Sequence, residues 1–136
     1  KLLDGSMPAL PDVGFGVVDV RDVAALHVRA LTAPGMAGER FIASGPFLKL
    51  RDVAAILHAQ LGAQAHKVPQ RTMPDWLVRL VARFNPIARL VVGELGSVRH
   101  QDASHAQAVL GWVPRPVEQS IVETARDLIR LGVVKV

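Results

Sequence analysis

Residues 16–30, GVVDVRDVAALHVRA, constrain the fold most, because an apolar run passes without a loop into a sequence that favours a helix. Residues 17–20 are apolar at nearly every position, which is typical of a buried strand with neighbours on both sides. Asp19 stands where a helix N-cap would be, and Asp22 lies in the first turn, where a carboxylate opposes the positive end of the helix dipole. We therefore expect a short strand over residues 17–20 that leads into a helix, and capping explains both carboxylates without acid–base chemistry.

The first half of the chain continues this alternation of helices and extended segments. The first helix has an apolar face at helical spacing, made by Val20, Val23, Ala24, Val28 and Leu31. Residues 40–44, RFIAS, have the composition of a second strand, and residues 66–70, HKVPQ, that of a third extended piece. Between them, residues 50–61 repeat apolar side chains at helical spacing, and Gly62 follows in the position of a C-cap glycine.

The second half of the chain has helix signals only. Prolines, an aspartate and glycines at the boundaries predict four helices, over residues 74–84, 86–92, 102–110 with Asp102 as the N-cap, and 116–132. We therefore expect a mostly helical α/β chain with about six helices and two or three short strands.

Composition bounds the class of protein. A chain of 136 residues suffices for one domain, and with 50% hydrophobic but only 4% aromatic residues its core must be aliphatic. No apolar run approaches the roughly 20 residues that a membrane span needs. The chain has no cysteine, which excludes a disulfide framework and a thiol nucleophile and is usual in a reducing compartment, so we expect a cytoplasmic protein.

The net charge of +4 is spread over the whole chain. The densest basic group, Arg79, Arg83 and Arg89, lies on neighbouring helical turns without interleaved aromatic side chains on which bases would stack. A scattered excess of arginine is typical of a solvated surface. We therefore expect neither a nucleic acid nor a membrane as a partner.

Four segments carry a resemblance to a known family. They are GVVDVRDVAALHVRAL, GERFIASG, LRDVAAIL and ASHAQAVLGWVPRPVEQSIVETARDL, in this order across roughly residues 5–132. Their order and spacing resemble the C-terminal part of the extended short-chain dehydrogenase/reductase family, in particular its dihydroflavonol-reductase-like and NAD-dependent epimerase/dehydratase members. The resemblance implies a nicotinamide-dependent oxidoreductase or epimerase, with a Rossmann domain that holds NAD(P) and a smaller substrate-binding region.

The parts of that family that bind the cofactor and do the chemistry have no counterpart here. The family has a glycine-rich turn after its first strand, whereas Gly14 and Gly16 precede the expected strand. It also uses a tyrosine as general acid with a lysine four residues later, and this chain has no tyrosine. We therefore expect residues 1–136 to be a C-terminal fragment without the Rossmann domain and the Tyr/Lys pair, with no catalytic or cofactor-binding residue and no activity alone.

By the same resemblance, the fragment shapes the substrate pocket of a parent NAD(P)-dependent carbonyl reductase, dehydrogenase or epimerase. In the family the loop before the first strand of this region passes the reacting carbonyl, which places Gly14, Phe15 and Gly16 at the pocket. An aromatic ring between two glycines predicts an apolar surface and a small apolar carbonyl substrate. Trp76, at the start of a helix, is placed either to line this pocket or to contact a partner.

The histidines and the second tryptophan have structural explanations. His27 lies at the edge of the first helix's apolar face, where we expect it to pack and to bond to a backbone carbonyl. His100 and His105 are five residues apart and do not share a helix face, and no thiolate or glutamate joins them, so we expect no metal site. Trp112, after Gly111, is expected to be a packing residue.

One alternative remains open for the function, and one expectation concerns assembly. The alternative is a stand-alone small helical domain that binds a ligand or another protein in the apolar groove between its helices. If the chain is a fragment, apolar surface made to contact a missing sheet needs cover. We therefore expect self-association, through strand pairing at residues 17–20 or 40–44 or through swapped helices.

Overall fold

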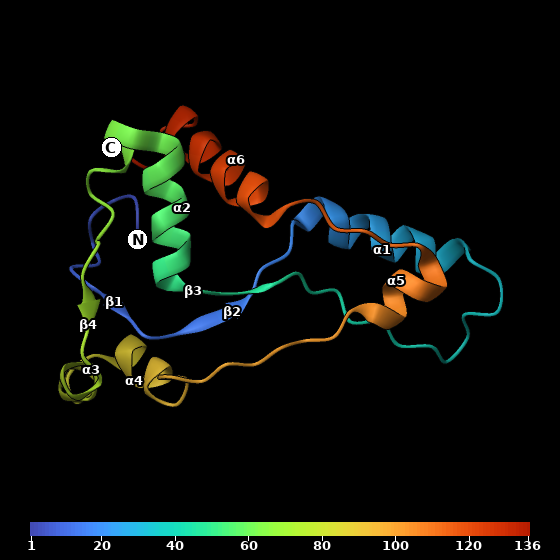
Figure 1. The fold of residues 1–136 in the computed structure, drawn as a ribbon, viewed down its shortest axis with the longest axis horizontal. Helices are drawn as coiled ribbons and strands as arrows, with labels where there is room; N and C mark the ends of the chain where they lie inside the picture. The colour runs from blue at the N-terminus through green and yellow to red at the C-terminus, as the bar shows by residue number, and fades with distance from the viewer.

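The computed structural model describes residues 1–136, apart from the side chain of Ile87. In chain order the elements are β1 (Leu10–Pro11), β2 (Gly14–Gly16), α1 (Val20–Thr32), β3 (Phe47–Lys49), α2 (Leu50–Leu61), the 3-10 helix η1 (Gly62–Ala65), β4 (Thr72–Met73), α3 (Asp75–Val81), α4 (Pro86–Val92), α5 (Ser104–Leu110) and α6 (Val117–Arg130). The molecule is elongated, with α2, α6 and both termini at one end and α1 and α5 at the other (Figure 1). The mostly helical α/β class expected from the sequence is confirmed.

The helix boundaries follow the expected capping residues closely. The Asp19 carboxylate accepts a hydrogen bond from the Arg21 backbone N at 2.8 Å, which starts α1 as predicted. Gly62 and Gly111 end α2 and α5 with φ values of +52° and +58°, a region of the backbone map that favours glycine. The prediction of Asp102 as an N-cap is wrong by one residue: the N-cap of α5 is Ala103, and Asp102, one position earlier, accepts from the Ser104 backbone N at 2.8 Å.

The strands lie elsewhere than predicted. β2 pairs antiparallel with β3, and β1 pairs parallel with β4. The expected strands over residues 17–20 and 40–44 are therefore wrong, and residues 66–70, expected as an extended piece at an edge or in a loop, form no strand. The reason is the close approach that glycine permits: a Cβ at Gly14 would lie 2.5 Å from the Phe47 ring, and one at Gly16 would lie 2.4 Å from Ser44 Oγ. The antiparallel pair of β2 and β3, two strands separated in the chain by α1, therefore forms outside the apolar run, and this run joins β2 to α1.

The buried face of α1 also differs from the prediction. Its buried residues are Asp22 and Leu26, one turn apart, and not the aliphatic stripe. In that stripe Val20, Val28 and Leu31 are between 61% and 84% exposed. Leu26 packs with Trp112, and Asp22 binds a distant arginine, so tertiary contacts outweigh the local apolar pattern.

Each end of the molecule has a hydrophobic core of its own. The first lies between the N-terminal segment, α2 and α6, and its buried residues are Leu3, Leu10, Ala54, Leu57, Leu61, Ala65, Val68 and Ala125. The second joins α1 to α5 and contains Leu26, Ala103, Ala106 and Trp112. Trp112 is 1% exposed and its Nε1 donates to the Asp22 carbonyl at 2.8 Å, which confirms its packing role. Within the described part of the chain, no helix has the length and apolarity to cross a membrane.

Candidate functional site

The loop predicted to face a substrate forms strand β2, which pairs antiparallel with β3. Phe15 pairs with Leu48 of β3 and is 50% exposed, while its two neighbouring glycines are half-buried. Lys49 Nζ donates to Asp12 Oδ1 at 2.8 Å, which ties the ends of the two strands together. Phe15 is therefore held on a backbone fixed by strand pairing, with half of its surface exposed.

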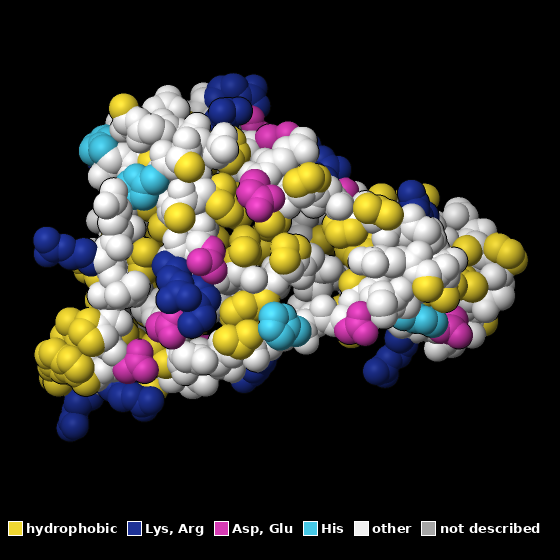
Figure 2. Space-filling model, viewed as in Figure 1, with side chains coloured by type: hydrophobic (Ala, Val, Ile, Leu, Met, Phe, Trp, Pro, Cys, Tyr) yellow, Lys and Arg dark blue, Asp and Glu magenta, His cyan; other side chains and the backbone are white. Residues whose placement is uncertain are grey.

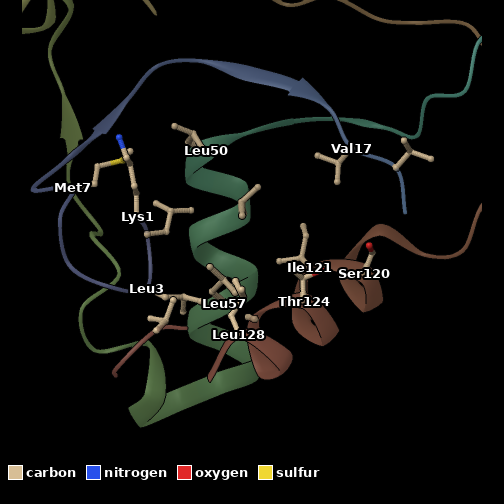
Figure 3. A pocket seen from close by; sticks show the side chains of 15 residues that line it. Lys1, Leu3, Met7, Val17, Leu50, Leu57, Ser120, Ile121, Thr124 and Leu128 are labelled. Carbon is tan, nitrogen blue, oxygen red and sulfur yellow. The ribbon is translucent and has the colours of Figure 1, made fainter. Parts of the chain in front are cut away.

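An apolar cavity of about 490 Å³ lies next to the end of β2. Its walls come from the N-terminal segment, from Val17 and Val18 directly after β2, and from α2 and α6, as Figure 3 shows. The residues that line it are Lys1, Leu2, Leu3, Met7, Val17, Val18, Leu50, Val53, Leu57, Ser120, Ile121, Thr124, Ala125, Leu128 and Val134. Its walls are almost wholly aliphatic, with two hydroxyls from α6, so it suits an apolar ligand and offers no acid–base pair.

None of the four predicted pocket residues lines this cavity. Gly14, Phe15 and Gly16 lie just before Val17, which is one of its lining residues. Trp76 is exposed at the start of α3 and is not among the lining residues. The position of this cavity was not predicted from the sequence, because its lining comes from the N-terminal segment, residues 17 and 18, α2, α6 and Val134, whose apolar residues look like ordinary core positions.

A buried ionic network fixes α1 against the segment before α6. Asp22 accepts from the Arg115 backbone N at 2.8 Å and from Arg115 Nη2 at 2.9 Å. Arg21 bridges Asp19 at 2.7 Å and Glu123 at 2.5 Å. Hydrogen bonds from Arg21 lower the pKa of Asp19 well below its usual range, and those from Arg115 lower the pKa of Asp22.

This network settles the role of the two aspartates. Both are buried, ionised and fully engaged, so neither is free to take a proton from a ligand. Asp19 caps the helix as predicted, whereas Asp22 binds Arg115 and does not act through capping alone. The sequence gives no signal for the Asp22–Arg115 pair, because 93 positions separate the partners.

The start of α1 and the two glycines of β2 do not fit a dinucleotide. A pyrophosphate needs open backbone N–H groups at a helix start with glycines that let it approach. Here the start of α1 carries the ionised Asp19 and Asp22, which repel a phosphate. The approach that Gly14 and Gly16 permit is used by Phe47 and by the Ser44–Gln101 pair, so no phosphate cradle forms at these positions.

The histidines take part in local packing. His27 Nδ1 lies 2.8 Å from the Val23 carbonyl oxygen, which confirms the expected bond, but its side chain is exposed and the expected packing is wrong. His105 stacks on Phe41 and its Nε2 lies 2.9 Å from a Glu39 oxygen. The His100 ring contacts the ring of Phe47, the first residue of β3, edge-on. Among the residues that the structure describes, no three potential ligands are grouped for a metal ion.

Comparison with known proteins places this geometry in a family context. No family model matches the chain. The putative dihydroflavonol 4-reductase of a Synechocystis strain is 28% identical over 149 residues, covering 99% of this chain and 43% of the relative. The ketoreductase azaE of Aspergillus niger is 35% identical over 95 residues, covering 68% of this chain and 27% of the relative.

The chain is a distant homologue of extended short-chain dehydrogenases/reductases. It corresponds to the C-terminal part of these proteins and spans less than half the length of the curated relatives that it matches. Among solved structures, that of gox2253 superposes with a TM-score of 0.75 at 24% identity, over 98% of this chain and 43% of that one.

A second solved structure is that of yeast methylglyoxal/isovaleraldehyde reductase Gre2 with NADPH. It superposes with a TM-score of 0.67 at 22% identity, over 96% of this chain and 37% of Gre2. At this identity the likeness shows a shared fold. The short strands and helices of this chain therefore match one part of the fold of an extended short-chain reductase.

Proposed function

We propose that this chain forms the substrate-binding C-terminal part of an NAD(P)-dependent oxidoreductase that acts on a small apolar carbonyl compound. The observation that carries the proposal is the match to reductases along nearly the whole chain, 99% of it for the Synechocystis relative, while only 43% of that relative is covered. The nicotinamide cofactor would be held by a region outside residues 1–136. This assignment agrees with the poor fit between a dinucleotide and the start of α1.

Within this part, strand β2 would form the wall that faces the substrate. Phe15 offers an aromatic side chain on a residue that is 50% exposed. The aliphatic cavity, whose lining includes Val17 directly after β2, extends the same apolar surface. Trp76 stands apart from this cavity, so we keep it only as a second contact, on the far side of the substrate or with a partner.

Calorimetric titration of the 136-residue chain with NADPH, and with NADH, tests where the cofactor site lies. We expect no heat of binding, because the first turn of α1 presents two carboxylates where a pyrophosphate would need free N–H groups. Micromolar affinity for either nucleotide would show that the chain holds a cofactor site, and this proposal would fail.

A hybrid enzyme tests the substrate-binding role. In yeast Gre2, the C-terminal portion that superposes on this chain is replaced by residues 1–136. We expect the hybrid to bind NADPH and to reduce a carbonyl compound, with a substrate preference that differs from that of Gre2. A hybrid that binds NADPH and keeps the parent's preference unchanged would show that this part does not shape the pocket.

The alternative, a stand-alone domain that binds an apolar ligand, is favoured by one observation, the cavity of about 490 Å³ between α2 and α6. Calorimetry distinguishes the two proposals. If the isolated chain binds a medium-chain aliphatic aldehyde or alcohol with micromolar affinity, and Leu57→Trp, which fills the cavity, abolishes this binding, the stand-alone function gains support. No binding to the isolated chain leaves the substrate-binding part of a reductase as the better explanation.

Self-association of the chain follows from its uncovered apolar surface. Val20, Val28 and Leu31 form an exposed stripe on α1, and residues 40–44 belong to no strand of the described chain. We propose that two copies bury these surfaces against each other. Light scattering should give a mass above that of the 14.6 kDa chain, and V28S/L31S should lower it. A monomer across a wide concentration range would contradict this proposal.

A further inference from the structure

The α3–α4 hairpin exposes an apolar stripe, of which the proposed function uses only Trp76, as a second contact. Trp76, Leu80 and Phe84 follow each other at intervals of four residues, so they share one face of α3 and of the turn that continues it. They are between 49% and 85% exposed. Figure 2 shows hydrophobic side chains gathered over α3, at the lower left, with Lys and Arg side chains along the same edge.

Three arginines border this stripe. Arg79 and Arg83 each lie three residues after a member of the stripe, which puts them along one side of it. With Arg89 of α4 they line one hollow of about 440 Å³, whose other lining residues are Ala82, Val92 and Gly93. Arg89 Nε donates to the Ala82 carbonyl at 3.4 Å.

The charges of these arginines are not neutralised within the chain. Among the described residues, no hydrogen bond or ion pair engages the guanidinium groups of Arg79 and Arg83. Asp75, four residues before Arg79, is the acidic residue of α3, and no carboxylate lines the hollow. The hairpin from Asp75 to Val92 therefore carries three positive charges and one negative charge, beside an exposed tryptophan and a phenylalanine.

We propose that the α3–α4 hairpin is a docking surface for an anionic lipid bilayer. An exposed Trp/Leu/Phe stripe flanked by arginines is the arrangement of an interfacial helix, with rings at the headgroup level and guanidinium groups on lipid phosphates. The unpaired arginines argue for an anionic bilayer over another apolar surface, because a neutral partner would leave their charges unmatched. The docking is peripheral, since no described helix crosses a membrane. It is independent of the proposed function and departs from the sequence-based expectation that the chain has no membrane partner.

Vesicle flotation of the 136-residue chain tests this proposal. We expect binding to vesicles of two parts phosphatidylcholine and one part phosphatidylglycerol, weaker binding as salt rises, and none to phosphatidylcholine alone. Each arginine near an anionic surface is worth roughly a fivefold change in partition coefficient, so R79Q/R83Q should lower it roughly 25-fold. R40Q/R126Q, which removes two exposed arginines elsewhere, should change it less than twofold.

The apolar stripe has its own pair of variants and its own signal. L80S/F84S should lower binding roughly tenfold or more, whereas V28S/L31S, which removes two exposed apolar side chains from α1, should not. Trp76 fluorescence should shift to the blue on anionic vesicles, while buried Trp112 should not respond, so Trp76→Phe removes the shift.

Three results would overturn the proposal. The first is the absence of binding to anionic vesicles by a chain whose circular dichroism shows it to be folded. The second is vesicle binding that V28S/L31S weakens as much as L80S/F84S does, which would assign it to uncovered surface in general. The third is binding that R79Q/R83Q weakens but L80S/F84S leaves unchanged, with equal retention on single-stranded DNA, which would make the hairpin a polyanion site.

Discussion

Replacing Asp22 with alanine cuts the main polar connection between α1 and the segment that precedes α6. The Asp22 side chain is 11% exposed and that of Arg115 is 26% exposed, at an Oδ1–Nη2 distance of 2.9 Å. Breaking a buried ion pair costs about 3–5 kcal/mol, because the remaining charge is left uncompensated. Arg115 retains some solvent and a second carboxylate, Asp19, 3.6 Å from its Nε. We therefore expect Asp22→Ala to lower the free energy of unfolding by about 3 kcal/mol.

A matched control separates burial from pairing. Asp127 and Arg130 form an ion pair of similar length, 2.8 Å, but their side chains are 59% and 72% exposed. Asp127→Ala should therefore cost less than about 0.5 kcal/mol. Urea unfolding measures both variants, and Trp112 reports on the Asp22 site when Trp76→Phe removes the other tryptophan. A loss for Asp22→Ala no greater than that for Asp127→Ala would refute the structural role assigned to this network.

Two further predictions concern stability. Because the pKa values of Asp19 and Asp22 are lowered by folding, their ionised forms stabilise the chain above the ordinary value of 3.8, and this stability is lost as pH falls toward the lowered values. The free energy of unfolding should therefore fall below about pH 4, with a shallower slope for Asp22→Ala; equal slopes would contradict the assignment. A Cβ at Gly45 would lie 2.1 Å from the Val17 carbonyl oxygen, so Gly45→Ala should cost about 1–3 kcal/mol in calorimetry. Gly93→Ala, which meets nothing within 4 Å, should leave the melting temperature nearly unchanged, and similar losses at both positions would refute the packing argument.

The helices of this chain could be predicted because their signals are local. Asp19 caps α1 through a hydrogen bond to a residue two positions away, and Gly62 and Gly111 end their helices through their own backbone conformation. The C-terminal part of an extended reductase was likewise recognisable, because the four segments that carry the resemblance keep their order along one chain.

The strands could not be predicted because their pairing depends on contacts that composition hides. Residues 17–20 have the apolar character of a strand, but the strand forms at Gly14–Gly16. There the glycines have no Cβ, so the Phe47 ring and Ser44 can approach the backbone. A strand with two glycines in three residues runs against ordinary strand propensity. The close approach of Phe47 and Ser44 to the glycine backbone therefore determines that β2 pairs with β3.

The buried face of α1 and the candidate cavity were missed for a related reason. The aliphatic spacing along α1 indicated one face, but Leu26 and Trp112 form a core with α5, and Arg115 buries Asp22. These partners lie more than eighty residues downstream, beyond any local pattern. The apolar stripe that remains exposed now carries the proposal of self-association, whereas the sequence-based prediction named strand pairing at residues 17–20 or 40–44 or swapped helices.

The most direct test of the central claim is substrate preference in the Gre2 hybrid. The measured quantity is the kcat/KM for isovaleraldehyde relative to that for methylglyoxal, compared between the hybrid and its Phe15→Ala variant. Val113→Ala, which truncates an exposed aliphatic side chain outside β2 and β3, is the control. If Phe15 lines an apolar pocket, the variant should lower this ratio roughly tenfold, because the branched aldehyde loses apolar contact and the smaller dicarbonyl does not. The KM for NADPH should stay unchanged. A ratio equal for Phe15→Ala and Val113→Ala would contradict the claim that this region shapes the substrate pocket.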